Sequence, residues 1–199
     1  MSMINLLKKL PVDFGQGELR AITKGKKIAM SYVENTKNKS ALDIGCREGI
    51  QSEWLKRKGY ITTSIDIDKK YNNCIIVDVN KELPFKDNEF DLIWCSEVIE
   101  HLIDPKVSIN EFNRVLKSDG KIIITTPNSY FWFYYIARIF GKKPRDLQNP
   151  DHKHFFSIKA IKELFPKGKI LGYFPYMVKK FIITKNIELL SPTFVVIDN

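Results

Sequence analysis

Cysteine is scarce in this sequence of 199 residues, and long apolar runs are absent. Three cysteines, Cys46, Cys74 and Cys95, are odd in number and too far apart for a disulfide framework or a zinc site, so we expect reduced, packed thiols. No segment reaches the roughly 20 apolar residues that a helix needs to cross a bilayer. Residues 1–15 hold too short an apolar core for a secretory signal and no small-residue cleavage site. We therefore predict a cytoplasmic protein.

Internal repeats and low-complexity linkers are also absent, so we place no domain boundary, and the length suits one domain over residues 1–199. The net charge is +9 but unevenly spread, because residues 41–137 carry −3 and residues 138–185 carry +9. A basic flank attracts nucleic acid, anionic lipid or an acidic small substrate. A solvated, lysine-rich surface is the simpler interpretation.

Short apolar strands, several separated by helical patterns, run through the chain. Seven strands are predicted, at 40–45, 60–68, 73–80, 90–97, 121–128, 169–174 and 193–198. Helices are predicted at 50–59, at 104–120 (capped by Asp104 and ended by Gly120) and at 157–165 (capped by Ser157). Residues 17–35 approximate helical periodicity, and 175–192 show no clear pattern. This order predicts an α/β sandwich around a parallel sheet.

Polar residues stand at the carboxyl ends of four consecutive predicted strands. These residues are Asp43, Asp66, Asp78 and the pair Ser96 and Glu97. Ligands of open α/β sheets bind at that edge, so this constellation predicts a binding site there.

The loop "ALDIGCREGIQ", residues 41–51, resembles a glycine-rich nucleotide loop, but its acids Asp43 and Glu48 would repel a pyrophosphate. Asp66 follows Asp43 by 23 residues, close to the offset at which an acid binds ribose hydroxyls. Asp78 can accept a hydrogen bond from an exocyclic amine. Two hydroxyls, an amine and a positive charge without phosphate describe S-adenosylmethionine better than NAD.

The chain resembles the class I S-adenosylmethionine-dependent methyltransferases of the small-molecule type that includes the ubiquinone-pathway enzymes. The motifs are "LDIGCREG", "SIDID", "VDVNKELPFKDNEFDLIWCSEVIEHLIDP" and "EFNRVLKSDGKIIITTPN", and the resemblance covers about residues 39–166. It implies a Rossmann-like α/β/α sandwich around a mostly parallel seven-stranded sheet with an antiparallel last strand. It also implies an N-terminal helical cap (1–38), a cofactor-binding half (39–127) and an acceptor-side half with an aromatic lid (128–199).

The resemblance assigns the methionine part of the cofactor to the glycine-rich loop. Asp43, Gly45 and Gly49 would shape the floor under it, with Cys46 in the same loop. Ser96 would offer its carbonyl oxygen to the methionine ammonium.

The adenosine part would lie against the next two strand ends. Asp66 would bind the ribose, with Ile67 packing against adenine. Asp78 would accept a hydrogen bond from the adenine amine, with the amide of Val79 beside it.

Arg47 departs from the family pattern, which usually has glycine there, where φ is positive or the backbone approaches the ligand. Either the position tolerates a side chain that points to solvent, or the arginine crowds the cofactor or pairs with its carboxylate. We favour tolerance, because Gly45 and Gly49 remain, and we predict that the chain binds the cofactor.

Methyl transfer from a sulfonium requires position and polarity from the protein, and we predict no metal. A general base is needed only where the acceptor is protonated at neutral pH, and histidine suits that role. The candidates are His101, within "EVIEHL", and His152 and His154, within "NPDHKHFF". A structural role is the alternative for each. We hypothesise that His152 or His154 orients or deprotonates the acceptor.

Residues 130–143, "YFWFYYIARIFGKK", are the most unusual stretch, because seven of the eleven residues 130–140 are aromatic. They predict a buried helix, a lid over an apolar acceptor, or an interfacial helix that contacts a membrane.

The leading hypothesis is therefore methyl transfer to a small or lipid-like acceptor, most readily at oxygen. A nucleic-acid methyltransferase is the second, supported by the basic flanks but by no recognisable RNA-binding appendage. A non-catalytic cofactor-binding protein is the third, suggested by Arg47.

Overall fold

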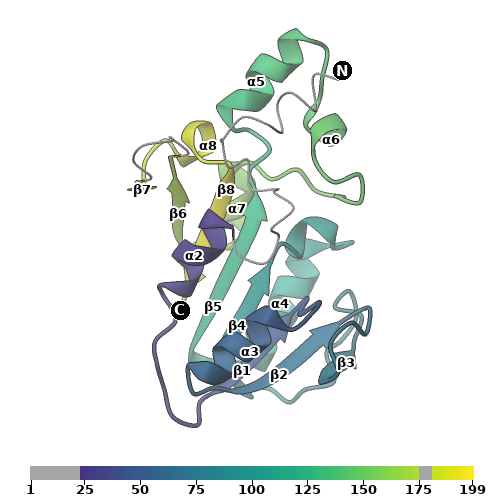
Figure 1. Ribbon diagram of the computed structural model, residues 1–199, viewed down its shortest axis with the longest axis vertical. Helices are drawn as coiled ribbons and strands as arrows, with labels where there is room; N and C mark the ends of the chain where they lie inside the picture. Colours follow the sequence, from purple (N-terminus) through teal and green to yellow (C-terminus); the bar gives the residue numbers. More distant parts are fainter. Residues whose placement is uncertain (1–22, 175–180) are drawn as a thin grey trace.

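A computed structural model describes residues 23–174 and 181–199, and an eight-stranded sheet forms its centre (Figure 1). The strand order across the sheet is β3-β2-β1-β4-β5-β8-β6-β7. The strands are β1 (Ser40–Ile44), β2 (Ile61–Asp66), β3 (Cys74–Ile76), β4 (Phe90–Ser96), β5 (Leu116–Pro127), β6 (Lys169–Tyr173), β7 (Ile182–Ile183) and β8 (Thr193–Asp198).

The first five strands are parallel, so their carboxyl ends share one edge of the sheet. β1 pairs with β2 and β4, β2 with β3, and β4 with β5, all in parallel. The last strand, β8, runs antiparallel to β5, as predicted, and β6 and β7 complete the sheet by antiparallel pairing. The Rossmann-like α/β arrangement is thus confirmed.

Helices cover both faces of the sheet. The helices of the described residues are α2 (Lys24–Met30), α3 (Ile50–Arg57), the 3₁₀ turn η1 (Ile99–His101), α4 (Pro105–Val115), α5 (Trp132–Ile139), α6 (Pro144–Leu147), α7 (Ile158–Leu164) and α8 (Ile187–Leu190). Ile28 of α2 and Leu55 of α3 share one buried cluster with Trp94, whereas Phe112 of α4 and Ile161 of α7 belong to the cluster on the opposite face. Burial on both faces explains the nearly continuous apolar strands.

Local capping chemistry sets two helix starts as predicted. The Asp104 carboxylate accepts hydrogen bonds from the backbone N–H groups of Lys106 and Val107, and Pro105 occupies the first position of α4. The Ser157 hydroxyl accepts from the N–H of Ala160 at the start of α7. Each side chain satisfies donors that have no partner within the helix.

The sheet differs from the prediction in two places. It has eight strands in the described residues rather than seven, because the two-residue β7 extends β6 from within the stretch that showed no pattern. The helix predicted to end at Gly120 ends at Val115, because the buried Leu116 already pairs with Phe90 of β4. Gly120 lies inside β5, in the irregular stretch that follows this pair.

The chain beyond the carboxyl end of β5 forms a separate cluster of short helices. Figure 1 shows α5 and α6 beyond that end of the sheet, away from α3 and the opposite edge. Within the described ranges, no helix has the length and apolar character needed to span a bilayer. All three cysteines are buried and free, as predicted.

Candidate functional site

The glycine-rich loop connects β1 to α3 and uses its glycines for backbone geometry. Gly45 and Gly49 have φ values of 75° and 77°, which favour glycine. A Cβ on Gly45 would lie 2.4 Å from the Val98 side chain, and one on Gly49 would lie 2.4 Å from the Tyr71 ring. Both positions therefore exclude a side chain. The buried Cys46 thiol between them has a pKa raised above its usual value by burial.

Arg47 adopts a positive φ of 48° in the same loop. Its backbone N–H donates to Asp66 Oδ2 at 2.9 Å, and its side chain is 47% exposed, with Nε 3.9 Å from Glu48 Oε2. The structure thus agrees with the first of the two interpretations, in which the side chain points to solvent. The left-handed backbone of a non-glycine residue costs about 1 kcal/mol, which the surrounding loop must offset.

Asp43 is buried at the carboxyl end of β1. The Ser52 hydroxyl donates to its Oδ2 at 2.5 Å, and Ser64 donates to Ser52 at 2.8 Å. Burial raises the pKa of Asp43 to about 7, although the Ser52 hydrogen bond and the positive charge of Lys26 act to lower it. A cationic ligand would favour the charged form of this carboxyl group.

Lys26 of α2 is a site residue that the sequence did not reveal. It is only 8% exposed, and its charge interacts with Asp43, Glu97 and Glu100. Burial lowers its pKa, whereas these carboxylates raise it. Three lysines lie in four residues of this helix, so nothing in the sequence distinguished the one that turns inward.

The remaining predicted cofactor residues lie where parallel pairing places them. Asp66 ends β2, and its Oδ1 accepts from the N–H of Asp68 at 3.1 Å. Ile67, which follows, is 64% exposed and thus available to a flat apolar group. Ser96 ends β4, and its hydroxyl is 2.7 Å from Thr125 Oγ1 of β5.

Asp78 follows β3 and helps to shape the next loop. Its Oδ1 accepts from the backbone and side-chain nitrogens of Asn80, which lowers the pKa of Asp78. The carbonyl oxygen of Val79 accepts from Ser108 Oγ at 3.0 Å. Because β1, β2 and β3 pair in parallel, their carboxyl ends place Asp43, Asp66 and Asp78 at the same edge of the sheet.

Two of the three histidines meet a buried carboxyl group. His101 Nε2 and His152 Nε2 lie 4.0 Å and 3.9 Å from Glu100 Oε1, and the two imidazole rings pack edge to face at 4.8 Å. Thr126 donates to Glu100 Oε2 at 3.0 Å, whereas Oε1 has no hydrogen-bond partner in the described part of the chain. Burial is the main cause that raises the pKa of Glu100 well above its usual value, and the Glu97 charge adds to the rise.

This His–Glu cluster (Glu100, His101 and His152) can serve acid–base chemistry or hold a cation. One ligand atom from each residue lies within 4.8 Å of the others, and imidazole and carboxylate are ligands that Zn²⁺ accepts. His101 Nδ1 contacts the carbonyl oxygen of Asp151 at 3.1 Å. Because a carbonyl only accepts, Nδ1 carries the proton, and Nε2 of neutral His101 can accept one.

His154 lies outside the His–Glu cluster. Its Nε2 is 3.0 Å from the carbonyl oxygen of Leu102 and 3.3 Å from that of Ile103, and its ring stacks on Phe156. These contacts connect the 152–156 segment to the loop that follows η1. They describe a structural role for His154.

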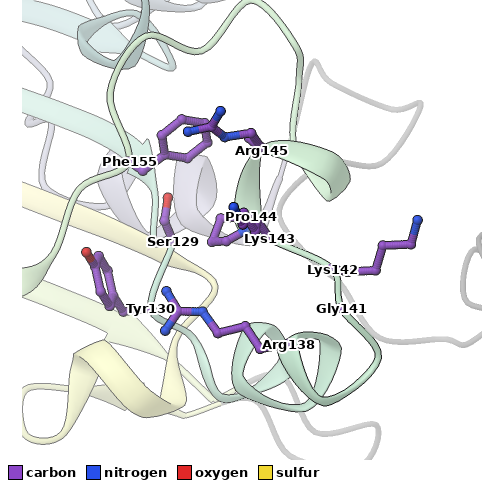
Figure 2. Close-up of a pocket in the computed structure, with 9 residues that line it drawn as sticks. All are labelled: Ser129, Tyr130, Arg138, Gly141, Lys142, Lys143, Pro144, Arg145 and Phe155. Atoms are coloured by element: carbon purple, nitrogen blue, oxygen red, sulfur yellow. The ribbon is translucent and has the colours of Figure 1, made fainter.

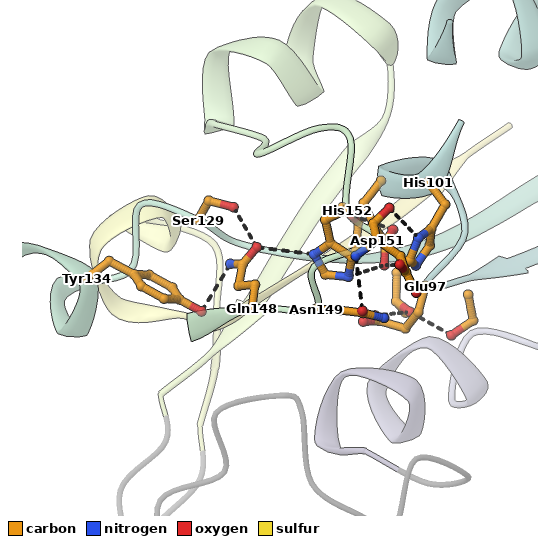
Figure 3. Close-up of polar contacts among 12 residues, drawn as sticks. Glu97, His101, Ser129, Tyr134, Gln148, Asn149, Asp151 and His152 are labelled. Atoms are coloured by element: carbon orange, nitrogen blue, oxygen red, sulfur yellow. Dashed lines mark hydrogen bonds and ion pairs between the residues drawn. The ribbon is translucent and has the colours of Figure 1, made fainter. Parts of the chain in front are cut away.

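A polar chain connects the His–Glu cluster to α5 (Figure 3). Gln148 Oε1 accepts from Ser129 Oγ at 3.2 Å and lies 3.3 Å from His152 Nδ1. Gln148 Nε2 donates to the Tyr134 hydroxyl at 3.0 Å. This chain holds the His152 ring with Nε2 toward Glu100.

The aromatic stretch forms α5, which is not buried all round. Tyr134 and Ala137 are buried, whereas an exposed apolar face is formed by Trp132, Tyr135, Ile136, Ile139 and Phe140. Ile139 is 81% exposed. Of the three interpretations, the buried helix does not fit this face.

Comparisons with known proteins agree with this architecture. A family model described as a methyltransferase domain matches residues 42–124. A ubiquinone biosynthesis O-methyltransferase of Glaesserella parasuis is 30% identical over 87% of this chain and 86% of its own length. One from Coxiella burnetii is 30% identical over 59% of this chain and 57% of its own.

Solved structures show the same fold. A SAM-dependent methyltransferase from Archaeoglobus fulgidus superposes with a TM-score of 0.65 at 20% identity, covering 87% of this chain and 91% of its own. A structure titled as a possible histamine N-methyltransferase from Thermotoga maritima has a TM-score of 0.63 at 17% identity, covering 87% of this chain and 86% of its own.

The fold and these comparisons thus define a Rossmann-like methyltransferase. The chain belongs to the class I S-adenosylmethionine-dependent methyltransferases. It is an enzyme, and its cofactor is S-adenosylmethionine.

Proposed function

We propose that this enzyme transfers the methyl group of S-adenosylmethionine to an oxygen atom of a small or lipid-like acceptor. The observation that carries the choice of oxygen is the His–Glu cluster, which offers a proton acceptor at the carboxyl edge of the sheet. The similarity of the chain to ubiquinone biosynthesis O-methyltransferases also supports an oxygen acceptor.

The cofactor would lie across the carboxyl ends of β1, β2 and β3. Asp66 would accept hydrogen bonds from the ribose hydroxyls, with Ile67 against the adenine. Asp78 and the Val79 amide would bind the adenine edge.

The methionine part would lie over Gly45, Cys46 and Gly49, near Asp43. The Ser96 carbonyl oxygen would bind its ammonium group. The buried lysine Lys26 would pair with the methionine carboxylate, because it is the cation that α2 turns toward Asp43.

The chemical step would be an in-line displacement. The acceptor oxygen would bond to the methyl carbon as the bond from that carbon to the sulfonium sulfur breaks, and an imidazole of the His–Glu cluster would accept the hydroxyl proton. His101 would meet the acceptor, because its side chain is 35% exposed, whereas that of His152 is 5% exposed. His152 and Glu100 would orient it. The predicted role of His154 as a base is replaced in this proposal by the structural role described above.

We further propose that the exposed face of α5 contacts a membrane surface where a lipid-like acceptor resides. The supporting observation is the set of large apolar side chains left in contact with solvent, including Ile139 and Phe140. A flotation assay with liposomes tests this contact, comparing the protein with an Ile139→Ser/Phe140→Ser variant. We expect the protein to float and the variant to remain in solution. Absence of the unchanged protein from the liposome fraction would reject membrane contact.

The enzymatic proposal is tested by measuring S-adenosylhomocysteine formation with a panel of catechols and hydroxyphenols, with and without alkyl tails. We expect turnover with hydroxyl acceptors, loss with His101→Gln and near-normal rates with the matched variant His154→Gln. Turnover with amines alone, or methyl incorporation into RNA alone, would instead favour nitrogen or nucleic-acid acceptors.

A further inference from the structure

A cavity of about 400 Å³ lies between α5, α6 and the loop that follows β5 (Figure 2). Its lining includes Ser129 and Tyr130 after β5, Phe155 from the 152–156 segment, and Arg138 at the end of α5. Arg145 of α6 also lines the cavity. In the view of Figure 2, Ser129 lies between the guanidinium group of Arg145, above it, and that of Arg138, below it. Two neighbouring helices, α5 and α6, therefore present two guanidinium groups to one space.

The lining is strongly positive. Four cations line the cavity, namely Arg138, Lys142, Lys143 and Arg145, and no carboxylate does. Within 23–174 and 181–199, none of the four forms an ion pair with a carboxylate. The nearby Asp146 accepts the backbone N–H of Lys143 at 2.7 Å, which caps α6. The cavity thus holds cationic charge that an anionic ligand would balance.

The guanidinium groups and the aromatic side chains of the cavity indicate which kind of anion it can bind. Two planar guanidinium groups can each donate paired hydrogen bonds, a geometry that suits phosphate oxygens. The Arg138 guanidinium also lies 5.8 Å from the centroid of the Tyr135 ring, a cation–π contact that helps to orient it. Tyr130 and Phe155 add aromatic surface, so an apolar group attached to the anion would also find contacts.

The cavity is connected to the proposed chemistry. Ser129 lines it and donates to Gln148, and Gln148 contacts His152 of the His–Glu cluster (Figure 3). We infer that this cavity is an acceptor subsite and that the methyl acceptor carries a phosphate group next to its apolar or aromatic portion. The inference rests on the proposed function, because it assigns the cavity to the same acceptor.

Binding of phenyl phosphate, phenol and inorganic phosphate, measured by calorimetry at low salt, tests the inference. The test variant is Arg138→Gln/Arg145→Gln, and the matched control is Arg57→Gln/Lys106→Gln, which removes the same charge from exposed positions on α3 and α4. We expect phenyl phosphate to bind the unchanged protein at least tenfold more tightly than phenol. The test variant should lose about tenfold or more in that affinity, and the control should retain it.

Equal affinity for phenyl phosphate and phenol would overturn the inference. Equal losses in the test and control variants would also overturn it, because they would show general charge attraction. Competition experiments distinguish a phospholipid headgroup from a soluble phosphate ester as the natural ligand. Displacement of phenyl phosphate by phosphatidylglycerol vesicles, but not by phosphatidylcholine vesicles, identifies a lipid headgroup. Displacement by inorganic phosphate alone identifies a soluble phosphate ester. S-adenosylhomocysteine binding is measured in parallel. If the protein binds S-adenosylhomocysteine but does not bind phenyl phosphate, the acceptor subsite is refuted and the methyl-transfer proposal is unaffected.

Discussion

Cofactor binding should release a proton from Asp43, because this carboxyl group is buried beside the proposed site of a cationic ligand. Burial raises its pKa from 3.8 to about 7, against the lowering effects of the Ser52 hydrogen bond and the Lys26 charge, and the Asp66 charge adds to the rise. At pH 6, a group with that pKa is protonated in about nine molecules of ten. A sulfonium and an ammonium placed nearby would favour the carboxylate and expel that proton.

The size of the effect follows from the same shift. A rise of about 3 pKa units corresponds to about 4 kcal/mol for ionising Asp43 in the folded, ligand-free protein. The unfolded chain ionises near pH 3.8, so this group's contribution to the free energy of unfolding falls as the pH rises from about 4 to about 7. Above pH 7 the full cost remains, and bound cofactor would offset part of it.

Calorimetric titration with S-adenosylmethionine at pH 6, in buffers of different ionisation enthalpy, measures the released protons. The amino group of the ligand is already protonated at pH 6 and does not contribute. We expect release of more than about half a proton, and less with S-adenosylhomocysteine, which lacks the sulfonium.

Two variants assign the proton. Asp43→Asn should remove most of the release, and Glu100→Gln should remove only what the second buried carboxyl group contributes. The same proton release by Asp43→Asn and by the unchanged protein on cofactor binding would refute the assignment of this proton to Asp43.

Three further results are expected. Gly49→Ala should reduce the free energy of unfolding, measured by urea denaturation, by roughly 2–4 kcal/mol, because the new Cβ would meet the Tyr71 ring. In the matched variant Gly141→Ala, which has a similar φ of 70° and open space around it, the loss should be about 1 kcal/mol. Equal losses in the two variants would contradict this prediction. Arg47→Gly should leave cofactor affinity within about twofold in calorimetry and raise the unfolding midpoint, because it relieves a left-handed backbone; a large change in affinity would show that the side chain touches the ligand. His101→Gln should lower kcat with hydroxyl acceptors about 100-fold, and EDTA should leave the rate of the unchanged protein unaffected. Loss of activity in EDTA, restored by a divalent cation, would show that the His–Glu cluster holds a metal.

Much of the fold could be predicted, because apolar strand patterns and helix caps act locally. The acids at the ends of β1, β2 and β3 were identifiable for the same reason, since parallel pairing brings carboxyl ends together. The end of α4 was not, because Leu116 leaves the helix to pair with Phe90, a partner 26 residues earlier in the chain.

The missed parts of the site depend on contacts between distant segments. Lys26 can be identified as a site residue only from the packing of α2 over the sheet, which places its charge near Asp43, Glu97 and Glu100. His101 and His152 are 51 positions apart, and only tertiary structure shows that they share Glu100 while His154 does not. Side-chain exposure on α5 likewise follows from packing, because its sequence is apolar on nearly every face.

The most direct test of the central claim is a crystal structure with S-adenosylhomocysteine bound. We predict that the ribose hydroxyls lie within hydrogen-bond distance of the Asp66 carboxylate, the adenine against Ile67, and the methionine part over Gly45 and Gly49. A nucleoside bound elsewhere, with Asp66 still accepting only from the backbone N–H groups of Arg47 and Asp68, would contradict the account.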